Sequence, residues 1–171
     1  MKVYFDVFSN DELISDSYQI TLEYNDVIMV VPSRMIAKGG DDVDIGRGNE
    51  FGGGGEDEAV DNTVERVNEI ITGFSLQETS FTKKEYVAVA KAYMQKLKKF
   101  LTEQESPRIN DFMQGATTFV KWVVANFDEF KFYTGANYDQ SAMIVLSYYK
   151  NPEDEAPHFL FIKDGLREEK Y

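Results

Sequence analysis

The sequence predicts an α+β protein in which antiparallel strands surround one long helical hairpin. Three observations lead to this prediction. Apolar residues alternate with a period of two in residues 2–8 and 18–24, a capping box opens a long amphipathic stretch at Thr82, and a second such stretch follows Ser106-Pro107. The chain has 171 residues, which is enough for one domain of ordinary size, and we expect residues 1–171 to form a single domain.

Alternating apolar and polar residues predict several strands before residue 38. The pattern is clearest in residues 18–24, where Ile20, Leu22 and Tyr24 alternate with polar side chains. We expect Asn25-Asp26 to form a two-residue hairpin turn between this strand and the next one, which ends at Pro32. The predicted strands span residues 2–8, 18–24, 27–31 and 34–37.

Two long amphipathic helices are predicted between residues 82 and 127. Thr82 and Glu85 have the spacing of a capping box, in which the hydroxyl and the carboxylate each accept a hydrogen bond from the other residue's amide. Apolar residues then recur every three or four positions as far as Leu101. Ser106-Pro107 supplies a second start signal, a capping serine followed by a proline at the first helical position. The short connection predicts an antiparallel helical hairpin over 82–127.

Further strands are predicted outside the hairpin, with one ambiguous segment before it. Residues 63–79 have helical spacing in their first half and strand alternation in their second half, and we favour a strand from about Ile70 onward. Three apolar runs predict strands at 130–134, 142–149 and 158–163.

Residues 38–62 interrupt the pattern with glycine and acidic side chains. Eight of the 12 glycines fall between Gly39 and Gly55, which predicts a long mobile loop. The loop lacks the lysine that follows the last glycine of a phosphate-binding loop, and its spacing does not fit an EF-hand. Either it is simply solvated, or its oxygen-bearing side chains bind calcium weakly. The candidate calcium ligands are Asn49, Glu56, Asp57 and Glu58.

The composition excludes several classes of chemistry and partner. The chain has no cysteine and one histidine, His158, so it can form neither a thiol nucleophile nor a cysteine or multi-histidine metal site. A net charge of −12 repels phosphate backbones and anionic lipids, so we expect no nucleic-acid or membrane partner. No signal peptide or run of about 20 apolar residues is present, and we expect a cytoplasmic protein that is a monomer and needs no cofactor.

Three acidic residues follow the first predicted strand. Asp11, Glu12 and Asp16 fit a solvated turn, because aspartate is a favoured turn residue, or alternatively a binding contact. Paired carboxylates can also perform acid–base catalysis when burial separates their pKa values. A carboxylate-only hydrolase is therefore the remaining enzymatic interpretation.

The first predicted helix carries a cluster of lysines on an otherwise acidic protein. Residues 83–100 contain six lysines and one glutamate, a local charge of +5. This basic ridge fits a docking surface for an acidic partner, or alternatively a solvated helix face. The six lysines are Lys83, Lys84, Lys91, Lys96, Lys98 and Lys99.

Several motifs together resemble the translationally controlled tumour protein family over essentially the whole chain. They are DELISDSY (11–18), the acidic glycine-rich loop after residues 45–46, LQETSFTKKEY (76–86), YMQKLK (93–98), ANF (125–127), GANYDQSAMIVLSYY (135–149) and FIKDGLREEKY (161–171). The resemblance implies a tent-like antiparallel β fold with a helical hairpin, similar to that of a GTPase-binding chaperone. Methionine sulfoxide reductases share this fold but use a catalytic cysteine, which this chain lacks.

The resemblance also implies a function. Family members are cytoplasmic, non-enzymatic proteins linked to calcium binding, microtubule association, and growth and survival signalling. The basic hairpin is the family's proposed tubulin contact and corresponds to Lys83–Lys99 here. The alternative is a regulator or nucleotide-exchange partner of a Ras-like small GTPase, and the acidic residue proposed to contact it corresponds to Glu12.

This sequence departs from the family pattern at three places. Gly135 is followed by Ala136 where the family has glutamate, and Lys131 replaces a neutral amide of the family's suggested calcium site. Residues 50–51 are Glu-Phe, near the position where the family carries a phosphorylatable serine.

Overall fold

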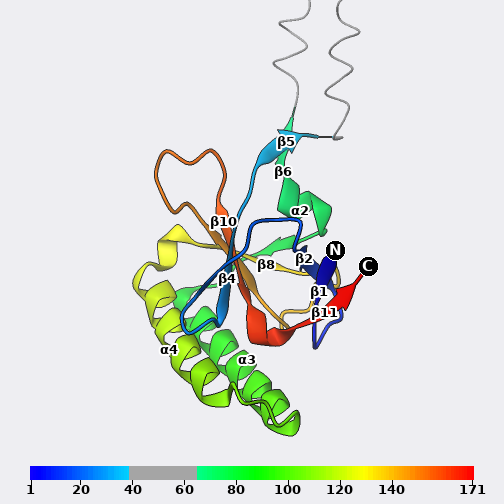
Figure 1. The fold of residues 1–171 in the computed structure, drawn as a ribbon. Helices are drawn as coiled ribbons and strands as arrows, with labels where there is room; N and C mark the ends of the chain where they lie inside the picture. Colours follow the sequence, from blue (N-terminus) through cyan, green and yellow to red (C-terminus); the bar gives the residue numbers. More distant parts are fainter. Residues whose placement is uncertain (39–64) are drawn as a thin grey trace, which may run out of the picture.

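A six-stranded antiparallel sheet forms the centre of the computed structural model, which describes residues 1–38 and 65–171 (Figure 1). Its inner strands are rich in branched and aromatic residues, and in β10 four of five residues are buried. Leu160 lies between Val30 and Leu146 in the sheet register, at the centre of the core. In spatial order the strands are β3 (Thr21–Glu23), β4 (Ile28–Pro32), β10 (His158–Ile162), β9 (Val145–Tyr148), β8 (Lys131–Thr134) and β7 (Gln77–Thr79).

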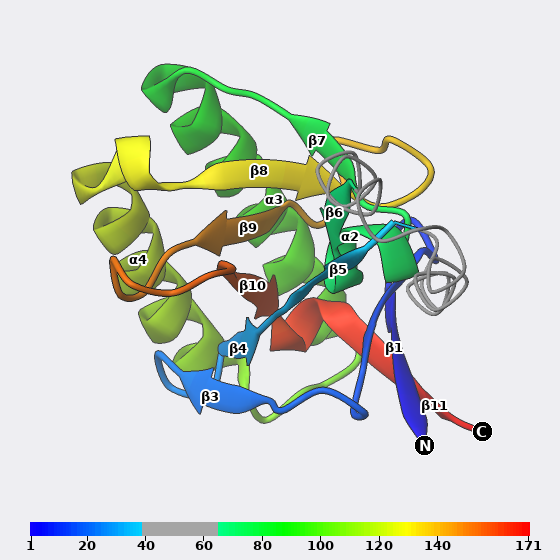
Figure 2. The ribbon, with the colours of Figure 1, turned by 90° about the horizontal axis from the view of Figure 1, so that it is seen from above.

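Two smaller antiparallel sheets accompany the central one. The three-stranded sheet has the order β11 (Leu166–Lys170), β1 (Lys2–Asp6), β2 (Glu12–Ser15), and it brings the two chain termini side by side (Figure 2). The amide of Tyr171 donates to the Met1 carbonyl at 2.8 Å. The two-stranded sheet pairs β5 (Met35–Ala37) with β6 (Arg66–Asn68) and projects from the body above the short helix α2 (Glu69–Gly73).

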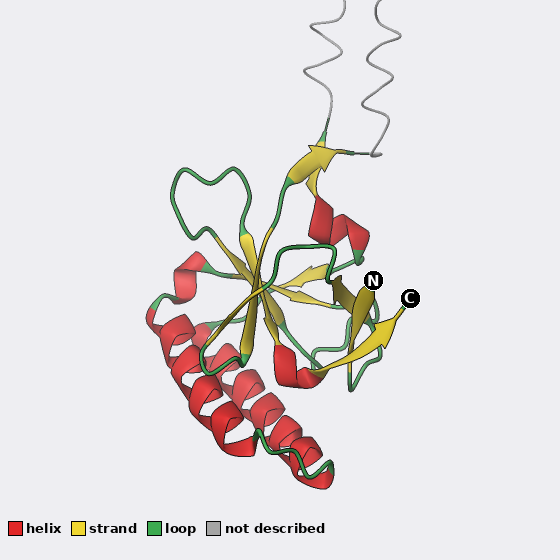
Figure 3. Ribbon diagram, in the orientation of Figure 1, coloured by secondary structure: helices red, strands yellow, loops and turns green. Residues whose placement is uncertain are grey.

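The helical hairpin covers one side of the six-stranded sheet (Figure 3). It consists of α3 (Lys83–Glu103) and α4 (Ile109–Ala125), and short 3₁₀ helices follow at Phe127–Glu129 and Lys163–Gly165. The predicted capping box is present: the Glu85 amide donates to the Thr82 hydroxyl at 3.1 Å, and the Thr82 amide donates to the Glu85 carboxylate at 2.8 Å. The two helices bury the predicted apolar face against the sheet, including Tyr93, Leu97, Phe112 and Phe119.

The α+β fold class, with antiparallel sheets and an inserted helical hairpin, is confirmed. The predicted loop 38–62 lies outside the described residues apart from Lys38. Three strands were not predicted from the sequence pattern: β2 and β11, which complete the small sheet around β1, and β6, which pairs with β5. The strand expected at 142–149 is shorter, because the Met143 amide donates to the Asp6 carboxylate and pairing begins only at Val145.

The strand predicted from Ile70 onward is wrong. Residues 69–73 form helix α2, and β7 begins only at Gln77. The reason is local, because the Asn68 side chain accepts hydrogen bonds from the amides of Ile70 and Ile71 and caps the helix.

Two predicted turn and helix boundaries are also wrong. The hairpin turn between β3 and β4 has four residues, 24–27, rather than two. Three of them, Tyr24, Asn25 and Asp26, have positive φ angles between 55° and 62°. Helix α4 begins at Ile109 instead of Pro107, because the Ser106 hydroxyl accepts from the Arg108 amide at 3.1 Å in a turn that precedes the helix.

Gly115 allows α4 to pack directly on the turn between β3 and β4. A Cβ at this position would overlap the Tyr24 carbonyl oxygen and lie 2.6 Å from Cγ2 of Val27. We expect Gly115→Ala to lower the free energy of unfolding by about 1–3 kcal/mol, because backbone must move to admit the methyl group. Urea denaturation measures the change.

The matched control is Gly73→Ala in α2. Its Cβ would meet only the Tyr18 hydroxyl, at 3.8 Å, so we expect a change within about 0.5 kcal/mol. Equal stabilities for the two variants would contradict the close packing of α4 on this turn.

Candidate functional site

Two segments far apart in the sequence meet around two buried aspartates. Asp6 is 2% exposed and Asp11 is 6% exposed. One oxygen of Asp6 accepts from the amides of Phe8 and Ser9, at 2.8 and 3.4 Å, and the other accepts from the Met143 amide at 2.9 Å. The carboxylate of Asp6 therefore closes a turn in its own segment and also holds the segment before β9.

Asp11 makes the second connection between these segments. One of its oxygens accepts from the Asn137 side-chain amide at 2.6 Å, and the other accepts from the Ser9 hydroxyl at 3.0 Å and the Asn137 backbone amide at 3.4 Å. Ser9 thus donates to both aspartates and joins them into one network. A buried carboxylate needs such donors, because an unpaired charge away from water is very costly.

Gly135 permits the close approach of the two segments. A Cβ at this position would overlap the Asp11 carboxylate and lie 2.7 Å from its Cβ. The residues that follow are exposed, and Tyr138 is 68% exposed with a φ of 61°. Glu12 is exposed next to Asp11, at the start of β2. The network therefore fixes the backbone next to Glu12 and holds the exposed turn 136–138 against Asp11.

The acidic residues near the N-terminus do not together form a solvated turn, since only Asp16 of the three lies in an exposed turn. Asp11 is buried and hydrogen-bonded, Glu12 opens a strand, and the Asp16 carboxylate accepts from the Lys2 amide at 3.0 Å. All four oxygens of Asp6 and Asp11 already accept hydrogen bonds, which is a structural use of these carboxylates. The carboxylate-only hydrolase gains no support from this arrangement.

Asp6 and Asn137 were not predicted as parts of this network. Asp6 lies at the end of an apolar strand and is followed by a polar turn, which is the local signal of an aspartate that caps its own turn. Its bond to the Met143 amide spans 137 positions, and no local pattern could have indicated it.

The predicted basic ridge is exposed along α3, and none of its six lysines forms an ion pair within 4 Å among the described residues. Five of them also make no side-chain hydrogen bond there. Lys84, Lys91 and Lys98 are spaced by seven residues, so they form one stripe along the helix. The sixth lysine differs. Lys96 donates to the Ser141 carbonyl at 3.3 Å, and its ammonium lies 4.3 Å from the centre of the Phe8 ring. Lys96 therefore fastens α3 to the loop before β9.

Another charged contact connects the hairpin to the short 3₁₀ helix that precedes β11. Arg108, just before α4, donates to Asp164 at 2.9 and 3.0 Å, and the hydrogen bond to Asp164 raises the pKa of Arg108. In the loop before β9, the hydrogen bond from the Ser141 hydroxyl lowers the pKa of Asp139. Tyr93 is buried beside Gly165, and burial raises its pKa well above the ordinary value. These contacts leave the ionised forms of Arg108 and Asp139 favoured.

Comparison with known proteins gives a consistent answer over the full length. The sequence pattern of the translationally controlled tumour protein family matches residues 1–167. The translationally-controlled tumor protein homologue of Plasmodium berghei is 41% identical and that of Saccharomyces cerevisiae is 40% identical, with at least 99% of both chains covered in each case. The chain belongs to the translationally controlled tumour protein family.

Solved structures of the family share its fold. The translationally controlled tumour-associated protein p23fyp of Schizosaccharomyces pombe matches with a TM-score of 0.79 and 36% identity, and both chains are covered completely. The family protein of Caenorhabditis elegans matches with a TM-score of 0.65 at 20% identity, which supports the fold alone. Two of the motifs on which the resemblance rested, 11–18 and 135–149, are the segments that Asp11 and Asn137 join.

The calcium ligands predicted for this family member lie outside the described residues. These are Asn49, Glu56, Asp57 and Glu58. Within residues 1–38 and 65–171, no three His, Cys, Asp or Glu side chains come together in a way that could hold a metal ion. Over the same ranges, no helix is both long enough and apolar enough to cross a membrane.

Proposed function

We propose that the protein is a non-enzymatic interaction protein of the cytoplasm that associates with microtubules through the basic face of α3. One observation supports this proposal above the others: on a protein of net charge −12, one face of a helix carries lysines that have no ion-pair partner within residues 1–38 and 65–171. The residues of this face are Lys83, Lys84, Lys91, Lys98 and Lys99. Weak calcium binding by the segment around residues 49–58 stays a prediction.

The basic face suits an acidic, extended partner such as the tubulin surface. Buried residues of α3, among them Tyr86, Tyr93 and Leu97, fix the helix on the sheet, so its lysines are displayed on a rigid element. A local positive surface on a negative body also orients the protein as it approaches an anionic partner. Such attraction weakens as salt concentration rises.

Charge reversal tests this face directly. We expect the triple variant Lys84→Glu, Lys91→Glu, Lys98→Glu to lose co-sedimentation with microtubules at low ionic strength, because attraction becomes repulsion. The side chains are exposed, so thermal stability should change little.

A second triple variant, Lys121→Glu, Lys131→Glu, Lys163→Glu, is the matched control. It changes the net charge by the same amount at exposed positions outside α3. It should pellet as the unmodified protein does. Equal pelleting of both variants would show that α3 is not the contact.

The surface around Glu12 supports a second candidate function, regulation of a Ras-like small GTPase. Glu12 is exposed while the adjacent Asp11 is fixed by Asn137, so the carboxylate is presented from a rigid strand beside the exposed turn 136–138. An acidic contact on a rigid support is suited to a basic patch on a partner protein.

Nucleotide release from a Ras-like GTPase of the same cell tests this candidate. We expect the protein to change the rate of release of a fluorescent GDP analogue, and Glu12→Lys to abolish that change. Glu153→Lys, an exposed charge reversal in the loop between β9 and β10, should retain it. An unaltered release rate with the unmodified protein at excess concentration would reject the GTPase role.

A further inference from the structure

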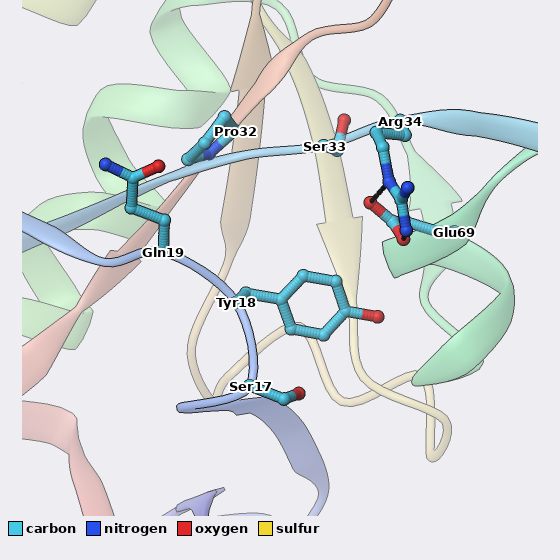
Figure 4. Close-up of a pocket in the computed structure, with 7 residues that line it drawn as sticks. All are labelled: Ser17, Tyr18, Gln19, Pro32, Ser33, Arg34 and Glu69. Carbon is cyan, nitrogen blue, oxygen red and sulfur yellow. Dashed lines mark hydrogen bonds and ion pairs between the residues drawn. The ribbon is translucent and has the colours of Figure 1, made fainter.

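A polar hollow of about 440 Å³ lies at the base of the β5–β6 hairpin, and its lining includes no residue of the two surfaces described above (Figure 4). Its volume is within the range of small-molecule sites, about 300–1,000 Å³. Residues 17–19 form one wall, residues 32–34 form the opposite wall, and Glu69 of α2 closes one end.

The hollow arises because two neighbouring strands separate. β3 pairs with β4 only over Thr21–Glu23, whereas β4 continues to Pro32 alongside β10. The chain before Thr21 therefore leaves the sheet while residues 32–34 continue towards β5. The Ser33 hydroxyl donates to the Pro157 carbonyl at 2.6 Å and accepts from the Asn68 side chain at 2.8 Å, which fixes the second wall.

Arg34 supplies a positioned positive charge at the end of this hollow. Its Nε and Nη2 atoms donate to the two oxygens of Glu69 at 3.3 and 3.2 Å. The Glu69 side chain is 12% exposed, but that of Arg34 is 80% exposed. The Nη1 group of Arg34 has no acceptor in the described part of the chain, so one edge of the guanidinium is open to a ligand.

An aromatic ring and an aliphatic ring line the hollow from opposite walls. Tyr18 packs on Phe74 with ring centroids 6.0 Å apart and points towards the Arg34–Glu69 pair, and Pro32 lies on the opposite wall. Burial raises the pKa of Tyr18, so its hydroxyl stays protonated and can donate. The side-chain amide of Gln19 is exposed at the same wall.

We propose that this hollow binds a carboxylate carried on an apolar or aromatic stem. The open edge of the Arg34 guanidinium matches the two oxygens of a carboxylate, and the Tyr18 hydroxyl adds a neutral donor. The stem lies between the Tyr18 and Pro32 rings. A singly charged carboxylate fits better than a phosphate dianion, because Glu69 and the negative body of the protein oppose a second charge.

Such a carboxylate has two natural sources, the free C-terminus of a peptide and a small aromatic acid. The test uses both probes: an acetylated tripeptide ending in phenylalanine and 3-phenylpropionate, each titrated into the full chain and followed by amide chemical shifts. We expect saturable shifts in residues 17–19, 33–34 and 69. Tighter binding of the tripeptide assigns the site to chain termini, and tighter binding of phenylpropionate assigns it to small acids.

Substitutions identify the group that recognises the carboxylate. Arg34→Gln should weaken binding at least about tenfold, and Tyr18→Phe should weaken it a few-fold. Arg66→Gln is the matched control, because it removes an arginine from the same hairpin outside the hollow, and it should leave affinity unchanged.

Three results would overturn the proposal. They are an absence of saturable shifts with either probe, equal affinity for the C-terminal amide of the tripeptide, and unchanged binding by Arg34→Gln. Inorganic phosphate binding as tightly as the carboxylates would contradict the choice of ligand class. Because Arg34 is 80% exposed, its substitution should leave the fold intact, which an unchanged amide spectrum elsewhere would verify.

Discussion

Two buried carboxylates hold the first part of the chain against the loop before β9. Asp6 and Asp11 together accept hydrogen bonds from four backbone amides, those of Phe8, Ser9, Asn137 and Met143. They also accept from the Ser9 hydroxyl and the Asn137 side-chain amide. Because each charge is removed from water, loss of one donor leaves an expensive unpaired oxygen. The arrangement therefore has one low-energy geometry, and that geometry places Glu12 on a rigid strand.

The helical hairpin is tied to the same region by different interactions. Lys96 donates a hydrogen bond to the Ser141 carbonyl, and its ammonium group contacts the face of the Phe8 ring. Arg108 forms an ion pair with the largely buried side chain of Asp164 near β11. The basic face of α3 and the surface around Glu12 are therefore both held in place by the same packed core. A protein built in this way presents charges at fixed positions, which is the property that the proposed interactions with other macromolecules require.

Local signals predicted much of the fold and little of the site. The capping box at Thr82 and the spacing of apolar residues every three or four positions predicted the start and end of α3 closely, because both signals depend on neighbours in the sequence. Helix α2 was missed because one Asn68 side chain decides it. The network around Asp6 depends on a bond to Met143, and the hollow beside Tyr18 depends on where two strands part. Both are consequences of tertiary packing that sequence periodicity does not record.

Native-state hydrogen exchange on Asp6→Asn tests the central role of the two carboxylates most directly. The substituted side chain can still accept from Phe8, but its amide group would face the Met143 amide, donor against donor. We expect the amides of Met143 and Asn137 to lose protection together, while those of α3 from Tyr86 to Leu97 keep theirs. If Met143 alone lost protection and Asn137 kept its own, the two aspartates would act independently and the account would be contradicted.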